Sequence, residues 1–132
     1  MPIAKQLTLI VPNRVGQLAR VTQALAEKRL NINAISIVDT ADYGLLRMVV
    51  DDPERAATVL REAGYDVCTD DVLAITVPNR PGELARLTQA LAKVRVNISY
   101  IYSGSAGRGN ALIVLKVNNV RRALNALEEK AI

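Results

Sequence analysis

The chain has 132 residues, a net charge of +4 and no histidine, tryptophan or phenylalanine. Half of its residues are hydrophobic, which is typical of a globular protein with an aliphatic core rather than of a disordered chain. Without histidine there is no Ser-His-Asp triad and no histidine metal ligand, and the sequence has no CxxC spacing. We therefore expect a protein that is not an enzyme and that carries no cofactor or metal ion.

The remaining composition indicates where the protein works. The only cysteine, Cys68, excludes an intrachain disulfide and favours a reducing, cytoplasmic location. The start of the chain lacks the apolar region of a signal peptide, and no apolar run reaches the roughly 18 residues of a membrane span. Acidic and basic residues are interspersed, so we expect a mixed solvated surface that binds neither nucleic acid nor membrane.

The first half of the chain predicts a strand, a helix and a hairpin. Leu7 to Val11 is a short apolar run that ends at Pro12, as in a strand. From Val15 to Arg29 the apolar residues recur at helical spacing, which predicts an amphipathic helix that Asn31 ends. Two strands then follow over residues 32–38 and 43–50, joined by a turn.

A second helix and a fourth strand complete this unit. Asp52 suits the N-cap of the helix, Pro53 its first position, and Gly64 its end. Residues 65–69 predict a strand, and the pair at residues 70–71 predicts a turn. The order β-α-β-β-α-β is ferredoxin-like, with an antiparallel sheet and both helices on one face.

The chain then repeats itself. Residues 7–37 match residues 73–103 without a gap, at a shift of 66. We therefore predict two domains, residues 1–70 and 71–132, related by a pseudo-twofold axis with one shared interface. In the second copy the pattern predicts strands over 73–77, 98–102 and 111–117, and helices over 81–95 and 120–130, the last one capped by Asn118 or Asn119.

The second copy ends early. The counterpart of the strand at residues 65–69 would begin at Ala131, so the expected fold is α+β, with tandem ferredoxin-like units of which the second lacks its last strand. An unpaired sheet edge is a docking place or a liability. We expect this edge to be paired, either by residues 1–6 or across a dimer.

The two copies agree best where the first strand meets the first helix. Asn13-Arg14 and Gly16 recur as Asn79-Arg80 and Gly82. Core packing does not require an unchanged Asn-Arg-x-Gly, whereas ligand binding does. The first N–H groups of a helix favour an anion such as a carboxylate, and an asparagine amide can contact both a carboxylate and an ammonium group. With Pro81 as the first helical residue, Arg80 is the expected cap.

Simpler roles stand beside this one. The loops are also ordinary turns and caps, and Asn31 and Asn97 are candidate helix C-caps in left-handed conformation. Tyr100 and Tyr102 either form the wall of a pocket or cover the sheet. The leucines of the two repeated helices, on their apolar faces, are expected in the core: Leu18, Leu25, Leu84 and Leu91.

At these residues the sequence resembles ACT domains, small β-α-β-β-α-β modules that bind amino acids and regulate metabolic enzymes. The resemblance covers the first strand, the Asn-Arg-x-Gly-x-Leu loop, the helix and the Asn-Ile that follows it, in both copies. It is closest to stand-alone proteins made only of tandem ACT domains.

The resemblance implies two ligand sites between units, each joining the loop of one unit with the second strand of the other. One site would join Asn13, Val15, Gly16 and Leu18 with Asn97 and Ile98, and the other would join Asn79, Pro81, Gly82 and Leu84 with Asn31 and Ile32.

The function expected from these residues is non-catalytic sensing of a free amino acid at the interface of the two units. We expect a homodimer that acts on a metabolic enzyme. The alternative is a regulatory or structural partner subunit of such an enzyme with no ligand of its own. RNA binding is disfavoured, because the aromatic pattern of an RNA-recognition sheet is absent.

Overall fold

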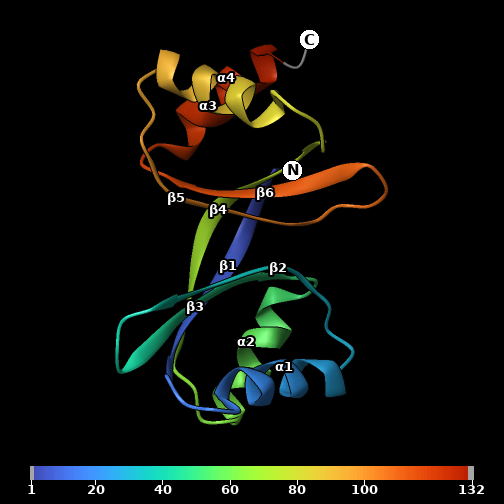
Figure 1. The fold of residues 1–132 in the computed structure, drawn as a ribbon, viewed down its shortest axis with the longest axis vertical. Helices are drawn as coiled ribbons and strands as arrows, with labels where there is room; N and C mark the ends of the chain where they lie inside the picture. The colour runs from blue at the N-terminus through green and yellow to red at the C-terminus, as the bar shows by residue number, and fades with distance from the viewer. Residues whose placement is uncertain (1, 131–132) are drawn as a thin grey trace. The chain divides into compact units, whose positions relative to one another are not determined.

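The computed structural model describes residues 2–130 (Figure 1). Ten elements follow one another along the chain: β1 (Ile3–Pro12), α1 (Gln17–Glu27), β2 (Ile32–Asp39), β3 (Tyr43–Val50), α2 (Pro53–Glu62), β4 (Val67–Pro78), α3 (Glu83–Lys93), β5 (Ile98–Ser105), β6 (Asn110–Val117) and α4 (Val120–Lys130).

The arrangement of the strands corrects the predicted fold. Hydrogen-bonded neighbours run in the order β1-β3-β2-β5-β6-β4 and close into a barrel. The expectation of tandem ferredoxin-like units with separate open sheets, the second lacking its last strand, is therefore wrong. The reason lies in β4, which continues for 12 residues through the pair at residues 70–71 where a turn was expected. Asp71 is accommodated in this strand by an ion pair with Lys5 of β1 at 2.7 Å.

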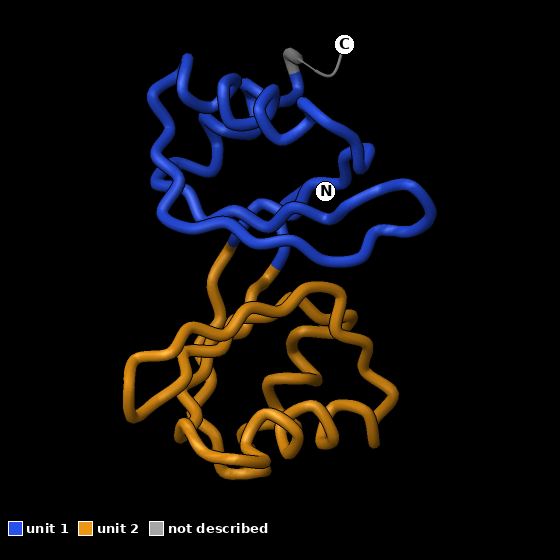
Figure 2. The backbone as a smooth tube through the Cα atoms, in the orientation of Figure 1, with its two compact units in different colours: residues 1–4, 72–132 blue, residues 5–71 orange. Residues whose placement is uncertain are grey.

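The chain divides into two compact units (Figure 2). Unit 2 is Lys5–Asp71, and unit 1 combines the residues up to Ala4 with those from Val72 onward. The long strands β1 and β4 therefore contribute residues to both units. Unit 1 is therefore discontinuous in sequence, whereas the predicted boundary at residues 70–71 divides the chain into two continuous segments.

Unit 2 has an aliphatic core between strands and helices. Leu9 of β1 pairs with Leu46 of β3, which pairs in turn with Ile37 of β2. Both α1 and α2 lie on the same face of these strands (Figure 1), and they bury Leu25 and Leu60 completely against it. The start of α2 is as predicted: Pro53 is in its first turn, and the side chain of the N-cap Asp52 accepts a hydrogen bond from the Arg55 backbone.

Unit 1 has an equivalent core. Leu73 of β4 pairs with Leu115 of β6, which pairs with Ile101 of β5. The helices α3 and α4 lie together on one face of these strands (Figure 1), where they bury Leu91 and Ala123. Of the two predicted caps of α4, Asn119 is the one observed, since its Oδ1 accepts a hydrogen bond of 3.0 Å from the Arg122 backbone N–H.

The N-terminal residues occupy the edge of unit 1 that was expected to lack a strand. The backbone N–H of Ala74 in β4 donates to the carbonyl of Pro2 at 2.7 Å, and Ile3 packs against the core of this unit. The edge is thus paired within the chain, the first of the two predicted alternatives. Met1 and Ala131, which that prediction also involved, lie outside the described residues.

Candidate functional site

The repeated loops begin their helices differently from the prediction. Both α1 and α3 have a glycine at the N-cap, Gly16 with φ of 88° and Gly82 with φ of 90°, and neither helix has a side-chain cap. The prediction that Arg80 caps the helix and Pro81 is its first residue is therefore wrong: α3 begins at Glu83. The helices begin at Gln17 and Glu83, whereas the predicted helices began at Val15 and Pro81. Glycine is the residue that adopts the left-handed N-cap conformation without strain.

The space beside both glycines is open. A Cβ atom added at Gly16 or Gly82 would meet no atom within 4 Å. The backbone conformation, rather than crowding within the chain, therefore explains why these positions are glycine. The first N–H group of each helix, that of Gln17 or Glu83, donates to the carbonyl of Arg14 or Arg80 at 3.3 or 3.4 Å. The next N–H groups, those of Leu18 and Leu84, have no intrahelical acceptor, and no side chain caps either helix. Such groups suit an anionic ligand.

The two loop asparagines have different surroundings. Asn13 Nδ2 donates to Asp39 Oδ1 at 2.9 Å and to the carbonyl of Ala41 at 3.1 Å, so both amide hydrogens are used by the β2–β3 hairpin. The Asn79 side chain makes no hydrogen bond within the described part of the chain, although its backbone N–H donates to the Gly109 carbonyl. Unit 1 therefore presents a complete amide to solvent, and unit 2 presents only the Oδ1 acceptor.

Apolar side chains around these loops are exposed. Val15 is fully exposed, and the exposed fractions of Leu18 and Leu84 are 38% and 46%. The prediction that all four helix leucines lie in the core is wrong for these two, whereas Leu25 and Leu91 are fully buried. Leu18 and Leu84 lie in the first turns of α1 and α3. Pro81, next to Gly82, is exposed as well.

The asparagines that precede β2 and β5 also differ. Asn31 Nδ2 donates to Asn33 Oδ1 at 2.7 Å, while the Asn97 side chain makes no hydrogen bond within the described residues. Neither is a left-handed C-cap, as one alternative had it: the residues with positive φ there are Arg29 and Arg95. Ile32 and Ile98 begin the strands, each next to an irregularity in strand register.

Within one unit the predicted residues fall into two separate groups. The loop with Asn13, Val15, Gly16 and Leu18 lies at the N-terminal end of α1, and Asn31 and Ile32 follow its C-terminal end. An α-helix of 11 residues is about 16 Å long. One amino acid therefore cannot contact both groups of the same unit. The same separation along α3 holds for Asn79, Pro81, Gly82 and Leu84 relative to Asn97 and Ile98.

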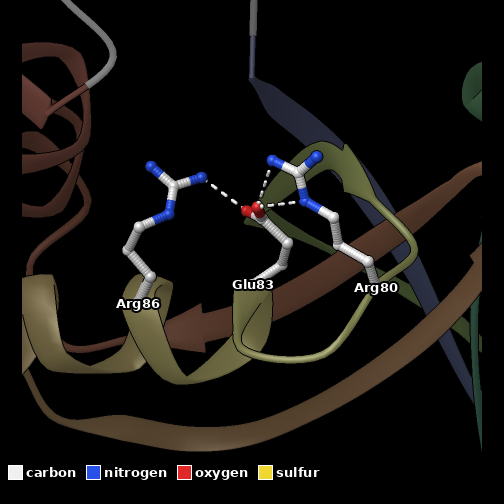
Figure 3. Close-up of polar contacts among 3 residues, drawn as sticks. All are labelled: Arg80, Glu83 and Arg86. Carbon is white, nitrogen blue, oxygen red and sulfur yellow. Dashed lines mark hydrogen bonds and ion pairs between the residues drawn. The ribbon is translucent and has the colours of Figure 1, made fainter.

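A charged cluster beside the second loop was missed. The carboxylate of Glu83, whose side chain is only 9% exposed, lies between the guanidinium groups of Arg80 and Arg86 (Figure 3). Arg80 Nε donates to Glu83 Oε1 at 2.9 Å, and Arg86 donates to Oε2. The hydrogen bond from Arg86, followed by that from Arg80, lowers the pKa of Glu83. Comparison of the two copies could have indicated this cluster. Both arginines recur in the first copy, as Arg14 and Arg20, while the residue equivalent to Glu83 is Gln17.

Three other features are relevant to a candidate site. No helix among residues 2–130 is long and apolar enough to cross a membrane. Across the same residues, no three His, Cys, Asp or Glu side chains are grouped so that they could hold a metal ion. Tyr100 and Tyr102 stack with their ring centroids 6.4 Å apart on one face of β5.

Comparison with solved structures identifies this architecture in other proteins. A protein from Bacteroides thetaiotaomicron has 36% sequence identity and a TM-score of 0.90, with 98% of this chain and 90% of that chain covered. The regulatory subunit of aspartate kinase from Thermus thermophilus, in its ligand-free form, has 21% identity and a TM-score of 0.71, with coverage of 98% and 96%. The corresponding subunit from Thermus flavus has 21% identity and a TM-score of 0.64, with the same coverage.

The family follows from the sequence as a whole. No curated protein matches the chain. The ACT domain pair family, however, matches residues 1–132, which is the entire length. The chain belongs to the ACT domain pair family.

Proposed function

We propose that this ACT domain pair is a regulatory protein without catalytic activity that binds a free amino acid at its repeated loops. The observation that carries the proposal is the form of those loops in a member of this family. Each combines an uncapped helix start, a left-handed glycine with open space beside it, and exposed apolar side chains. These are the groups that a small molecule with a carboxylate, an ammonium group and an apolar side chain would contact.

The loop of unit 1 is the stronger of the two candidates. The backbone N–H groups of Leu84 and Ala85 in the first turn of α3 would bind the carboxylate, and the free amide of Asn79 would contact the ammonium group through its oxygen. Leu84 would contact the side chain of the ligand. In unit 2, Asn13 has only its acceptor oxygen left for a ligand, so we expect weaker binding there.

The residues before β2 and β5 belong to the same proposal. Since they lie at the far end of each helix, they could contact the ligand only together with a loop of a different unit. Asn97 and Ile98 would then complete the site at Asn13, and Asn31 and Ile32 the site at Asn79. A homodimer stays part of the proposal, and sedimentation equilibrium with and without the ligand tests it.

The regulated partner is proposed to be a metabolic enzyme. Solved structures of similar fold include regulatory subunits of aspartate kinase, which supports a regulatory role without naming the enzyme. A ligand would act by binding one arrangement of the protein more tightly than another. Affinity in the micromolar to millimolar range, about −8 to −4 kcal/mol, would match metabolite concentrations.

A thermal-shift titration with the common amino acids tests this proposal. We expect one amino acid, or a few related ones, to raise the melting temperature of the wild-type chain and to do so less in Asn79→Ala. Asn125→Ala, an exposed asparagine on α4, is the matched control and should respond as the wild type does. If no amino acid shifts the melting temperature, or if Asn13→Ala and Asn79→Ala both respond normally, amino-acid binding at these loops is refuted.

A further inference from the structure

A groove lies within unit 2, beside the loop at residues 13–16. Its volume is about 770 Å³, and the residues that line it come from β1, the loop after β1, the start of α1, β3 and residues 63–68. None of the proposed amino-acid-binding residues of this loop, Asn13, Val15, Gly16 and Leu18, lines it. The groove adjoins this loop, since Arg14 and Gln17 line it, but it is lined by other side chains than those proposed to contact the amino acid.

The charged residues of this groove are mostly cationic. Arg14 and Arg20 line it, with Asp66 as the acidic residue among the lining side chains. The Arg14 guanidinium forms no ion pair within the described residues. Arg20 has weak contacts: it donates to the Ala63 carbonyl at 3.4 Å, and its guanidinium carbon lies 5.7 Å from the centroid of the Tyr65 ring.

Unit 1 shows what the equivalent pair of arginines binds. Arg80 and Arg86 both donate to the Glu83 carboxylate (Figure 3). The cavity beside Glu83 and Arg86 has a volume of only about 170 Å³. In unit 2 the residue at the position of Glu83 is Gln17, which carries no charge. Unit 1 thus holds a carboxylate between its two arginines, whereas in unit 2 the equivalent position is uncharged, the groove is larger, and no ion pair joins Asp66 to either arginine within the described residues.

The rest of the groove is suited to an apolar group. The walls are built from aliphatic and aromatic side chains of the strands and of the segment before β4: Leu9, Ile10, Pro12, Tyr43, Leu45 and Tyr65. Ile10 and Tyr43 are exposed to 61% and 53%, so their apolar surface is available to a ligand.

The planar guanidinium group of arginine binds a carboxylate or phosphate group with two parallel hydrogen bonds, which a lone ammonium group cannot do.

We propose that the unit 2 groove binds a small organic anion, with a carboxylate or phosphate group on an apolar body. The anionic group contacts Arg14 and Arg20 as the Glu83 carboxylate contacts Arg80 and Arg86, and the body lies against Tyr43, Leu45 and Tyr65. Gln17 keeps this site open, because a glutamate there would occupy the arginines. The site adjoins the amino-acid site proposed for unit 2 and uses different side chains.

Titration of the full chain followed by NMR tests the proposal with four probes. These are 3-phenylpropionate, phenyl phosphate, inorganic phosphate and the uncharged 3-phenylpropanamide. We expect one or both aromatic anions to bind saturably and to shift the backbone signals of Gly64 and Tyr65. Comparison of the two decides between carboxylate and phosphate, and the amide should bind at least about tenfold more weakly than the better anion.

The decisive variant is Gln17→Glu, which gives unit 2 the residue found in unit 1. It should weaken anion binding at least about tenfold while leaving the circular dichroism spectrum unchanged. Arg14→Gln should weaken binding similarly and serves if Gln17→Glu fails to fold. Glu83→Gln is the matched control, because it changes the equivalent position of unit 1 and should leave the shifts at Gly64 and Tyr65 unaltered.

Other results overturn the proposal. If the neutral amide binds as tightly as the anions, the groove selects apolar groups alone and the arginines have no role. If Gln17→Glu and Arg14→Gln bind the anions like the wild type, or if no probe binds saturably, the groove is not an anion site. None of these results bears on the amino-acid titration, since Asn79→Ala should leave anion binding unchanged.

Discussion

Asn13 and Asp39 are joined by a hydrogen bond of 2.9 Å between Nδ2 and Oδ1, which ties the loop after β1 to the end of β2. Asp39 Oδ1 also accepts from the Ala41 backbone N–H at 2.8 Å, so one carboxylate organises both segments. The residues at the equivalent positions of unit 1 are Asn79 and Ser105. No such bond joins them within the described residues. An asparagine that looks the same in both copies is thus structural in one and available in the other.

This difference predicts that only one of the two asparagines contributes to the free energy of unfolding. Asn13→Ala removes two hydrogen bonds, so it should lower the free energy of unfolding by about 0.5–1 kcal/mol. Asn79→Ala removes none from its side chain and should leave that free energy unchanged. Urea unfolding followed by circular dichroism measures both. Equal destabilisation by the two substitutions would contradict the different roles.

Leu25 and Leu18 provide a test of the corrected core. Leu25 is fully buried and Leu18 is 38% exposed, although both lie on α1 with apolar spacing. Leu25→Ala should lower the free energy of unfolding by about 2–5 kcal/mol because it leaves a cavity. Leu18→Ala, the matched control, should cost well under about 1 kcal/mol. Chemical denaturation of the two variants compares them directly, and a large loss for Leu18→Ala would return this residue to the core.

Gly82→Ala tests the left-handed helix start. With φ of 90° an alanine at this position is strained, although its Cβ would meet no atom within 4 Å. We expect a loss of about 1–2 kcal/mol from the free energy of unfolding, caused by the backbone alone. Ala85→Gly, in the first turn of α3, is a control in which glycine and alanine are exchanged in the opposite sense. A neutral Gly82→Ala in thermal and urea unfolding would mean that the helix starts in another way.

Glu83 should make stability depend on pH in the acid range. The hydrogen bonds from Arg86 and Arg80 hold the pKa of Glu83 below its ordinary value of 4.5. The folded chain therefore binds fewer protons at this carboxyl than the unfolded chain does. Its contribution to stability is fully present above pH 4.5 and is lost as the pH falls through the lowered pKa of the folded state.

Urea midpoints measured from pH 7 downward test this sign. Below pH 4.5 the midpoint of the wild type should fall more steeply than that of Glu83→Gln, whose side chain does not titrate in this range. Glu62→Gln, which removes an exposed carboxylate of α2, serves as the matched control and should follow the wild type. Parallel curves for the wild type and Glu83→Gln would show that the two arginines do not favour the charged carboxylate.

Ile3 tests whether N-terminal residues stabilise unit 1. Its side chain is partly buried against the core formed by β4, β6, α3 and α4. Ile3→Ala should cost about 1–2 kcal/mol and Ile3→Asp more, since a carboxylate would be placed against an apolar surface. Amide hydrogen exchange should locate the loss in β4 near Ala74, where the Pro2 carbonyl accepts a hydrogen bond. Exchange unchanged at Ala74 would contradict this role.

Local elements were predictable from the sequence because local chemistry decides them. Asp52 and Pro53 begin α2, as residue type indicated, and Asn119, one of the two caps that residue type offered, caps α4. The apolar spacing of Val21 and Leu25 gave the buried face of α1. The element order follows from such signals, and the repeat gave it twice.

The errors have a different origin, since they depend on contacts between distant residues. The acidic pair before Val72 favours a turn locally, but its pairing with β1, seen in the Lys5–Asp71 ion pair, keeps β4 continuous. The closed strand order follows from that continuity and has no local signature. Likewise, the sequence identified both loop asparagines, yet only the fold shows that Asp39 and Ala41 engage Asn13.

The shared strand β1 has a consequence for dissecting the molecule. A gene fragment that starts at the repeat boundary would encode the later half without Pro2 and Ile3. The edge of β4 near Ala74 would then lose its hydrogen-bonding partner, and an unpaired strand edge is prone to self-association. In a circular permutant, a glycine-rich tether would join the C-terminus to the original N-terminus, and the new ends would lie near residue 40, between β2 and β3. This permutant would keep the N-terminal residues next to β4. A truncated form of this protein that is meant to keep unit 1 therefore has to contain the N-terminal residues as well as residues 72–132.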